Sequence, residues 1–369
     1  MVTHHPMGAT ATVRVMSPEE IAARSGGETP YLLWPERGTH FAEREMRLRQ
    51  LAANHPMREF LLFAADLASA QQAQLAAYPA VALPDHEALD RAASRLAPPL
   101  AAIDFPRDPA WRSELRALLA RLPDSLPPAA RDTIGRVARA EDSWLETQAD
   151  CLLAGVTRGL DLAAAPLVAA GLQVYFTHLL LSVQASAIGR GQPFGRIEDE
   201  TVCPACASKP VASVTRNAGD LLGQRYLGCS LCGLQWHMVR IKCAHCLSTQ
   251  AITYQSLQRA ADEPDTGAAA SAVAQAEVCD SCGHYLKIFH SDRDPHVDAA
   301  ADDLATVTLD LLVSESGARR HGVNLMLLFG EPDSQTDDSA DDAAEGHPRA
   351  GTEISAAVRP PNPPDPGPR

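Results

Sequence analysis

Eight of the nine cysteines in this chain of 369 residues fall into four C-x-x-C pairs. No other feature constrains the fold as strongly, because two such turns supply the four soft donors of a tetrahedral metal site. The pairs are Cys203 with Cys206, Cys229 with Cys232, Cys243 with Cys246, and Cys279 with Cys282. The sequence therefore predicts two four-cysteine metal sites, with no paired thiol left over.

The spacing of the pairs favours a sequential arrangement. The first two pairs are separated by 22 residues, near the zinc-ribbon range of about 15–20, and the last two by 32. Interleaved or nested pairing stays possible, as does a short ribbon made from the two middle pairs alone. Gly233 and Gly283 follow the second cysteine of their pairs, which is typical of a knuckle that needs a permissive backbone.

The predicted sites are structural, not catalytic. A closed shell of four thiolates has no position for the water that a catalytic zinc keeps, and His237, His245, His284 and His290 are surplus once eight thiols are assigned. The sequence has no GxSxG motif, no phosphate loop and no GxGxxG after a strand, so no catalytic or cofactor-binding residue is predicted. Zinc binding worth about 10–16 kcal/mol per site would match or exceed the stability of a typical domain, about 5–15 kcal/mol.

Two other interpretations of the thiols stay open. A dithiol redox centre, acting through one C-x-x-C pair, usually lies at a helix N-terminus in a βαβ unit, which this region does not resemble. A nucleic-acid-binding ribbon should be basic, whereas residues 201–290 hold seven basic and six acidic side chains and become formally −3 with two filled divalent sites. The net charge of −14 also argues against duplex DNA or anionic lipid as a partner.

Composition along the chain predicts an α+β protein with an N-terminal all-helical domain. Residues 37–190 are rich in Ala and Leu at helical spacing, and proline turn signals divide them into five to seven helices. Residues 162–182 are nearly long and apolar enough to span a bilayer. Because Pro166, Gln173 and His178 interrupt this stretch, we expect a central core helix instead. Cys151, the unpaired cysteine, is expected to be a small buried hydrophobe.

After the helices we expect two zinc-ribbon-like modules of four cysteines each and a C-terminal helix. Segments 210–216, 223–229, 235–241 and 251–257 are β-prone and suit antiparallel hairpins, whereas 261–277 reads as a loop. The last helix is predicted at roughly 298–316, with Gly317 at its end. Its expected apolar face consists of Leu304, Val307, Thr308 and Leu311.

The predicted domain order has six parts. They are a flexible N-terminus (1–35), a helical domain (36–198), a first metal module (199–242), a second metal module (243–292), a C-terminal helix and turn (293–330), and an acidic, Pro-rich tail (331–369). The tail has nine acids against three arginines and too few apolar residues to order itself. The first twenty residues have no secretory h-region, so we expect the reducing cytoplasm, where paired cysteines more often bind metal than form disulfides.

The cysteine region resembles a known family, the formate dehydrogenase accessory protein FdhE. The likeness is carried by Cys229-x2-Cys232-x3-Trp236-His237-x2-Arg240-x2-Cys243-x2-Cys246 and by CDSCGHYLKI at 279–288. It extends to CPACASKPVAS, to DPHVDAAADDLATVTLDLLVSESG and to residues 41–72, and covers roughly residues 35–330. One departure is Leu325-Met326, where the family commonly has Pro-Phe; losing this proline relaxes the turn after the last helix.

This resemblance implies a helical domain with two rubredoxin-like four-cysteine modules that hold iron, with zinc as the alternative because ligation by four sulfurs suits both. It implies a cytoplasmic, non-catalytic factor that is required for maturation of respiratory formate dehydrogenase and associates with its catalytic subunit. All eight paired cysteines match metal-ligand positions of the family. Trp236, Arg240, Tyr285 and Lys287 belong to its signature, either as packing and charge near the thiolates or as client contacts. A homo-oligomer stays possible.

Overall fold

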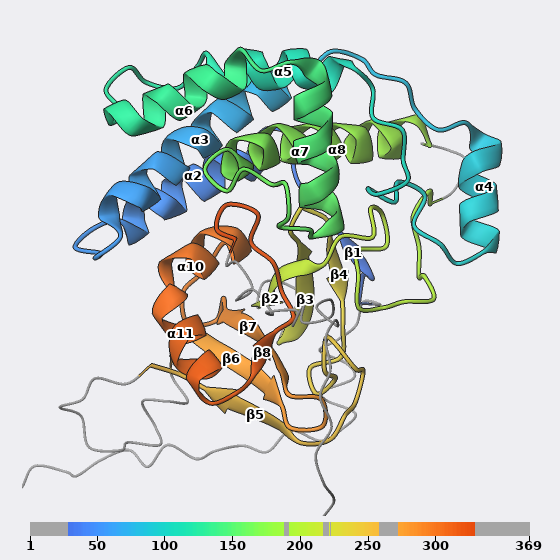
Figure 1. The fold of residues 1–369 in the computed structure, drawn as a ribbon. Coiled ribbons are helices and arrows are strands. Elements are labelled where there is room, and N and C mark those ends of the chain that lie inside the picture. Colours follow the sequence, from blue (N-terminus) through green and yellow to red (C-terminus); the bar gives the residue numbers. More distant parts are fainter. Residues whose placement is uncertain (1–28, 188–191, 217–220, 222, 258–271, 329–369) are drawn as a thin grey trace, which may run out of the picture. The chain divides into compact units, whose positions relative to one another are not determined.

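The structure, a computed structural model, describes residues 29–187, 192–216, 221, 223–257 and 272–328. The predictions for residues 1–28 and for the tail at 331–369 lie outside these residues, as does most of the loop predicted at 261–277. The predicted α+β architecture is confirmed: helices come first, then a sheet with two cysteine clusters, then short helices (Figure 1).

The helical region agrees with the expected number of helices between residues 37 and 190. Its members are α2 (His40–Leu51), α3 (Arg58–Ala76), α4 (His86–Ser94), α5 (Ala110–Leu119), α6 (Pro128–Ala138), α7 (Asp142–Ala154) and α8 (Ala165–Ser186). Local signals set several ends. The Asp85 side chain accepts a 2.7 Å hydrogen bond from the Ala88 amide and caps α4, and α7 ends at Gly155, which adopts φ +68°.

Helix α8 is the central helix that the apolar stretch predicts. It packs against α3, α5 and α7, and 83% of its most apolar window is buried inside the protein. Among the described residues it alone has the length and composition to cross a membrane. Gly171 lets α5 approach, because a Cβ there would lie 2.9 Å from Leu115 Cδ1.

One sheet contains both cysteine modules. Its strands are β1 (Leu32–Leu33), β2 (Pro210–Arg216), β3 (Gln224–Cys229), β4 (Gln235–His237), β5 (Ile252–Gln255), β6 (Ala274–Cys279), β7 (His284–His290) and β8 (Arg319–Arg320). The order is β1-β4-β3-β2-β7-β6-β5, with β8 on β7. Strands β2, β3 and β4 are antiparallel, as are β5, β6 and β7, and a parallel pairing of β2 with β7 joins the two sets.

Two segments differ from the predicted strand pattern. Residues 274–277, expected within a loop, begin β6, which gains hydrogen bonds from β5 on one side and β7 on the other. Pairing on both edges outweighs the weak β-propensity of Ala, Gln and Glu. The expected N-terminal boundary at residue 35 falls after β1, which pairs with β4 through Leu32 and Trp236.

The C-terminal helix is divided into two. Helices α10 (Ala299–Ala305) and α11 (Val307–Glu315) meet at Thr306, whose φ of −117° and ψ of 30° break the helical path. They pack against β2, β6 and β7 (Figure 1). The predicted apolar face is wrong at Thr308 and Leu311: both are exposed, Leu311 at 55%, whereas Leu309 and Val313 are buried. The break turns α11 relative to α10, so a single helical period does not describe both.

Candidate metal centres

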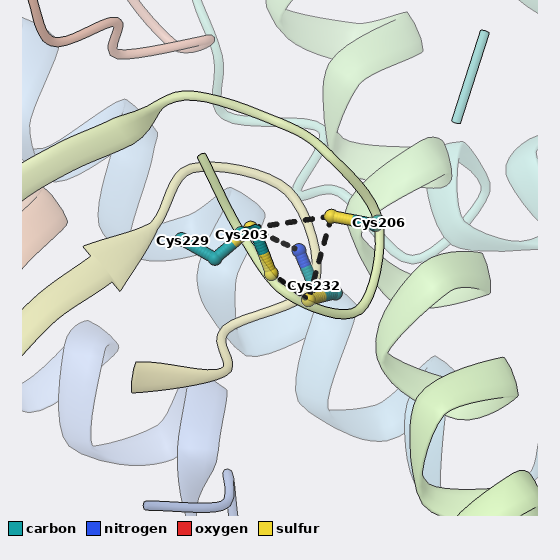
Figure 2. A group of neighbouring side chains, drawn as sticks. All are labelled: Cys203, Cys206, Cys229 and Cys232. Carbon is teal, nitrogen blue, oxygen red and sulfur yellow. Dashed lines mark hydrogen bonds between the residues drawn. The ribbon is translucent and has the colours of Figure 1, made fainter. Parts of the chain in front are cut away.

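The first two C-x-x-C turns form a buried four-sulfur cluster, here called site 1 (Cys203, Cys206, Cys229 and Cys232), shown in Figure 2. The Sγ–Sγ distances are 3.6 Å for Cys203–Cys232, 3.4 Å for Cys206–Cys229 and 3.6 Å for Cys206–Cys232. Metal–sulfur bonds of about 2.3 Å in a tetrahedron place sulfurs about 3.8 Å apart. The cluster thus has nearly the size that one tetrahedral ion requires.

Backbone geometry in the two knuckles aims the sulfurs of site 1 at one point. The Cys203 amide donates to Ser208 O, and the following turn places Ala207 at φ 61°. In the second knuckle Cys229 Sγ accepts the amides of Leu231 and Cys232, both at 3.4 Å. Such N–H groups offset thiolate charge.

Gly233 supplies the left-handed turn predicted after the second knuckle. Its φ is +75°, and a Cβ there would lie 2.6 Å from His40 Nε2. A glycine is therefore required both for the backbone conformation and for the close approach of α2.

Hydrogen bonds from the helical region hold both knuckles of site 1. From α8, Gln173 Nε2 donates to Ser230 O at 2.8 Å and Thr177 Oγ1 to Cys232 O at 3.3 Å. From the segment before α5, the amides of Leu100 and Ala102 donate to Ala205 O and Cys206 O, each at 2.9 Å. The polar residue Gln173 in an otherwise apolar stretch is the sequence signal that could have predicted this contact.

The last two C-x-x-C turns form site 2 (Cys243, Cys246, Cys279 and Cys282). Its Sγ–Sγ distances are 3.8 Å for Cys243–Cys282 and 3.8 Å for Cys246–Cys279. Cys243 and Cys279 are buried, but Cys282 is half-buried and Cys246 is exposed. The structure therefore brings the pairs together in the predicted sequential order, and each cluster could hold one metal ion.

The two sites repeat the same local structure. The Cys243 amide donates to Ser248 O, Leu247 has φ 61°, and Gly283 has φ +68°. These residues correspond to Cys203, Ala207 and Gly233 of site 1. The sites differ in one detail: Cys243 Sγ of the first knuckle accepts the amides of His245 and Cys246 at 3.4 and 3.5 Å, whereas in site 1 the accepting sulfur is that of Cys229 in the second knuckle. Two copies of one ribbon have been joined edge to edge through β2 and β7.

Burial and amide hydrogen bonds shift the pKa values of the thiols in opposite directions. Burial raises the pKa of Cys203 and Cys232 well above the ordinary range, and raises that of Cys282 to about 12. At Cys279 burial is outweighed by hydrogen bonds from the Cys282 and Ser281 backbone, and the pKa falls to about 7. A bound cation favours the thiolate form, so metal binding at either site would release protons.

The four histidines near the cysteines separate into two pairs. His237 Nε2 bonds Gln224 Oε1 at 2.9 Å, and His290 Nε2 bonds Gln275 Oε1 at 2.7 Å, so both lie in polar contacts of the sheet. His245 and His284 instead stack beside Cys282, with ring centroids 3.7 Å apart.

Three of the four signature residues outside the cysteines are buried within the fold. Trp236 donates from Nε1 to Glu200 O at 3.0 Å. The Tyr285 hydroxyl donates to Asp310 Oδ1 at 2.9 Å, and Lys287 binds Asp310 at 2.6 Å. Arg240 alone is exposed.

A buried cluster of ion pairs holds the second module against the C-terminal helices. The sequence analysis did not predict this cluster. Lys287, at 1% exposure, also lies 2.9 Å from Asp303, and Arg320 lies 2.7 Å from Asp303 and 3.0 Å from Asp310. The cluster joins β7 and β8 to α10 and α11. The two positive and two negative charges of the cluster cancel. Its acids, Asp303 and Asp310, both lie in the predicted last helix, and acids at buried positions of that helix were the sequence signal that could have indicated the cluster.

Two smaller expectations can also be compared with the structure. Cys151 is half-buried, not buried, and its Sγ lies 3.7 Å from Arg158 O. The segment after α11 is docked despite the missing proline: Asn324 Nδ2 donates to Ala300 O at 3.1 Å, and Leu325 and Met326 are buried.

Sequence models of the FdhE family match nearly all of the described region. The models for "FdhE, N-terminal", "FdhE, central domain" and "FdhE, C-terminal domain" match residues 29–191, 202–240 and 241–327. The chain belongs to the FdhE family. This is the formate dehydrogenase accessory family that the cysteine region resembles.

The alignments of this chain with individual relatives extend over nearly the full length of each relative. "Protein FdhE homolog" from Pseudomonas aeruginosa is 40% identical over 86% of this chain and 98% of its own. "Protein FdhE" from Escherichia coli O9:H4 is 33% identical over 87% of this chain and 99% of its own. The crystal structure of the FdhE protein from Pseudomonas aeruginosa aligns with a TM-score of 0.70 at 39% identity, over 82% of this chain and all of that one.

Proposed function

We propose that this FdhE-family protein is a non-catalytic cytoplasmic factor for the maturation of respiratory formate dehydrogenase. It binds the catalytic subunit of that enzyme and keeps the domain order predicted from the sequence. The observation that carries the proposal is the pair of four-sulfur clusters, each of the size of a closed tetrahedral site, in a chain whose relatives are FdhE proteins.

Sites 1 and 2 each hold one iron ion in this proposal, with zinc as the alternative. The donor set of four thiolates suits both ions, and all eight paired cysteines serve as ligands. Because four thiolates close the coordination shell, the ions stabilise the two ribbons and leave no open position for a reacting water. Catalysis belongs to the client enzyme.

A genetic experiment tests the role in maturation. Cells that lack the protein should lose formate oxidation, and the full-length chain should restore it. A Cys206→Ser variant should fail to restore it, whereas Cys151→Ser, which changes the unpaired cysteine, should succeed. Normal formate oxidation in the deletion strain would contradict the proposal.

A binding experiment tests the partner. The tagged full-length protein should co-purify the catalytic subunit of formate dehydrogenase from growing cells. Elemental analysis of the same anaerobic preparation should find two ions per chain, and its visible spectrum distinguishes red ferric thiolate from colourless zinc. Absence of the subunit from every eluate would contradict the binding step.

A second candidate function is a thiol-exchange role for site 2. It is favoured by the exposure of Cys246 and the partial exposure of Cys282, because thiolates that face solvent are the reactive ones. Thiol titration of the metal-loaded protein separates the two functions. Two or more rapidly reacting thiols would favour exchange, and fully protected thiols would favour a structural site.

A further inference from the structure

Three histidines gather beside site 2. The rings of His245 and His284 are stacked at 3.7 Å with an interplanar angle of 9°, and His321 meets His245 edge-on at 5.1 Å. One ring nitrogen of His245, one of His284 and the Cys282 sulfur lie within 4.8 Å of one another. Three imidazoles and a thiolate are thus placed on one side of the four-sulfur cluster.

Ring nitrogens in this group are available as ligands. His284 Nδ1 lies 3.0 Å from the carbonyl oxygen of Cys282, which can only accept, so in the neutral tautomer Nδ1 carries the proton and Nε2 has the free lone pair. His321 is 6% exposed, yet its Nε2 has no hydrogen-bond partner among the described residues.

A small cavity connects these residues. Its volume is about 10 Å³, and its lining includes His245, His284 and His321 together with the charged residues Arg225, Lys242 and Glu277, whereas Cys282 lies outside the lining. This is room for about one water molecule or one ion. A nine-tenths-buried nitrogen without a partner, at the wall of a cavity of this size, indicates an occupant.

We propose that His245 and His284 bind a third divalent ion of the zinc class, with Cys282 shared between this ion and site 2 and with His321 beside them at the cavity wall. Imidazole and thiolate are the donors that zinc, cobalt and nickel accept. Four thiolates around a divalent ion leave site 2 with a formal charge of −2, which attracts a second cation. The inference rests on the proposed function in one respect, because the ion in site 2 keeps Cys282 as the thiolate.

Binding requires one ring to move. Stacked rings direct their in-plane lone pairs along parallel lines, so both cannot point at one ion. His245 is exposed, and within the described residues its ring makes no hydrogen bond, so His245 is the ring that turns. The positively charged side chains of Lys209 and Arg319 lie near His245. Their charge makes the third ion more weakly bound than the ions of sites 1 and 2.

Metal counting on the full-length protein tests the proposal. Elemental analysis first counts the ions present as isolated, which reports on sites 1 and 2. Equilibrium dialysis against Co²⁺ should then add one ion per chain to the wild type. Its visible ligand-field bands should appear without loss of the ions already bound.

Variants locate the added ion. His245→Gln and His284→Gln should each lose the added Co²⁺ and keep the two original ions, whereas His86→Gln, at an exposed histidine of α4, should behave as wild type. Because His245 is exposed, its replacement leaves the fold intact, which circular dichroism checks. No added ion in the wild type, or an added ion that persists in the His245→Gln/His284→Gln double variant, overturns the proposal. Fewer than two ions in the wild type as isolated would instead count against the proposed function.

Discussion

Sites 1 and 2 have the same knuckles but different surroundings. Site 1 is buried at all four cysteines and receives hydrogen bonds from α8 and from the segment before α5. Site 2 exposes Cys246, leaves Cys282 half-buried, and belongs to the module that contains the edge strand β5. The same cysteine motif therefore has two different environments. At site 1 it joins the helical region to the sheet, and at site 2 it lies partly exposed at the surface.

The first prediction concerns the loss of each metal ion. Cys206→Ser should unfold the first module and break its contacts with α8. The metal-binding free energy of one site, about 10–16 kcal/mol, equals or exceeds the whole stability of a typical domain. Cys246→Ser should unfold the second module and spare the helices. Far-UV circular dichroism and limited proteolysis measure the two outcomes, with Cys151→Ser as the control. Equal loss of helix in both variants would contradict the difference between the sites.

The second prediction concerns what holds the second module in place of α8. Lys287→Met should destabilise the protein by about 3–5 kcal/mol, because it leaves Asp303 and Asp310 buried with only Arg320 to balance two charges. Urea unfolding measures the change. Arg58→Met, which removes an exposed pair with Glu59, should change stability by no more than about 1 kcal/mol.

The third prediction concerns the stability of the protein at acid pH and depends on His178, a buried residue of α8. Burial, and secondarily Arg37, lowers the pKa of His178 to about 4, below its ordinary value of 6.5. Between pH 6.5 and pH 4 this histidine is protonated in the unfolded chain but not in the folded chain. Its contribution to the free energy of unfolding is therefore complete above pH 6.5 and is lost as the pH falls toward 4.

The full effect is at most about 3.5 kcal/mol, since the pKa falls from 6.5 to about 4 and one pKa unit corresponds to about 1.4 kcal/mol, and about 2 kcal/mol of it is expected between pH 7 and pH 5. Chemical unfolding at pH 7 and pH 5 measures it, and His178→Gln should reduce the slope of stability against pH in that window. Gln50→Ala, which changes an exposed residue of α2 that does not titrate, should leave the slope as it is.

The fourth prediction has the smallest expected effect on stability and compares the rates of metal release from the two sites. Gln173→Leu removes the hydrogen bond to Ser230 O and should cost about 1–3 kcal/mol, because a buried carbonyl loses its donor. Chelator-driven metal release should become faster from site 1 and stay unchanged at site 2. Gln50→Ala, on the exposed face of α2, is the matched control. Faster release from both sites would show that α8 does not act on site 1 alone.

Much of the fold could be predicted because its signals are local. The C-x-x-C spacing predicted the pairing, the proline turns predicted the helices, and four β-prone segments correspond to β2, β3, β4 and β5. Strand β6 could not be predicted from Ala-Gln-Ala-Glu, because its strand conformation depends on partners on both sides. The break at Thr306 was missed for a similar reason: α11 packs on β6 and β8, and these contacts override the continuing helical pattern.

The candidate sites divide in the same way. Cysteine spacing and the following glycines determine the knuckles, since these depend on a few adjacent residues and on φ angles that glycine tolerates. The exposure of site 2, the hydrogen bonds of α8 to site 1, and the meeting of His245, His284 and His321 depend on contacts between residues far apart in the chain. The sequence by itself determined which atoms can bind metal, and only the tertiary structure decided which of them water and a partner can reach.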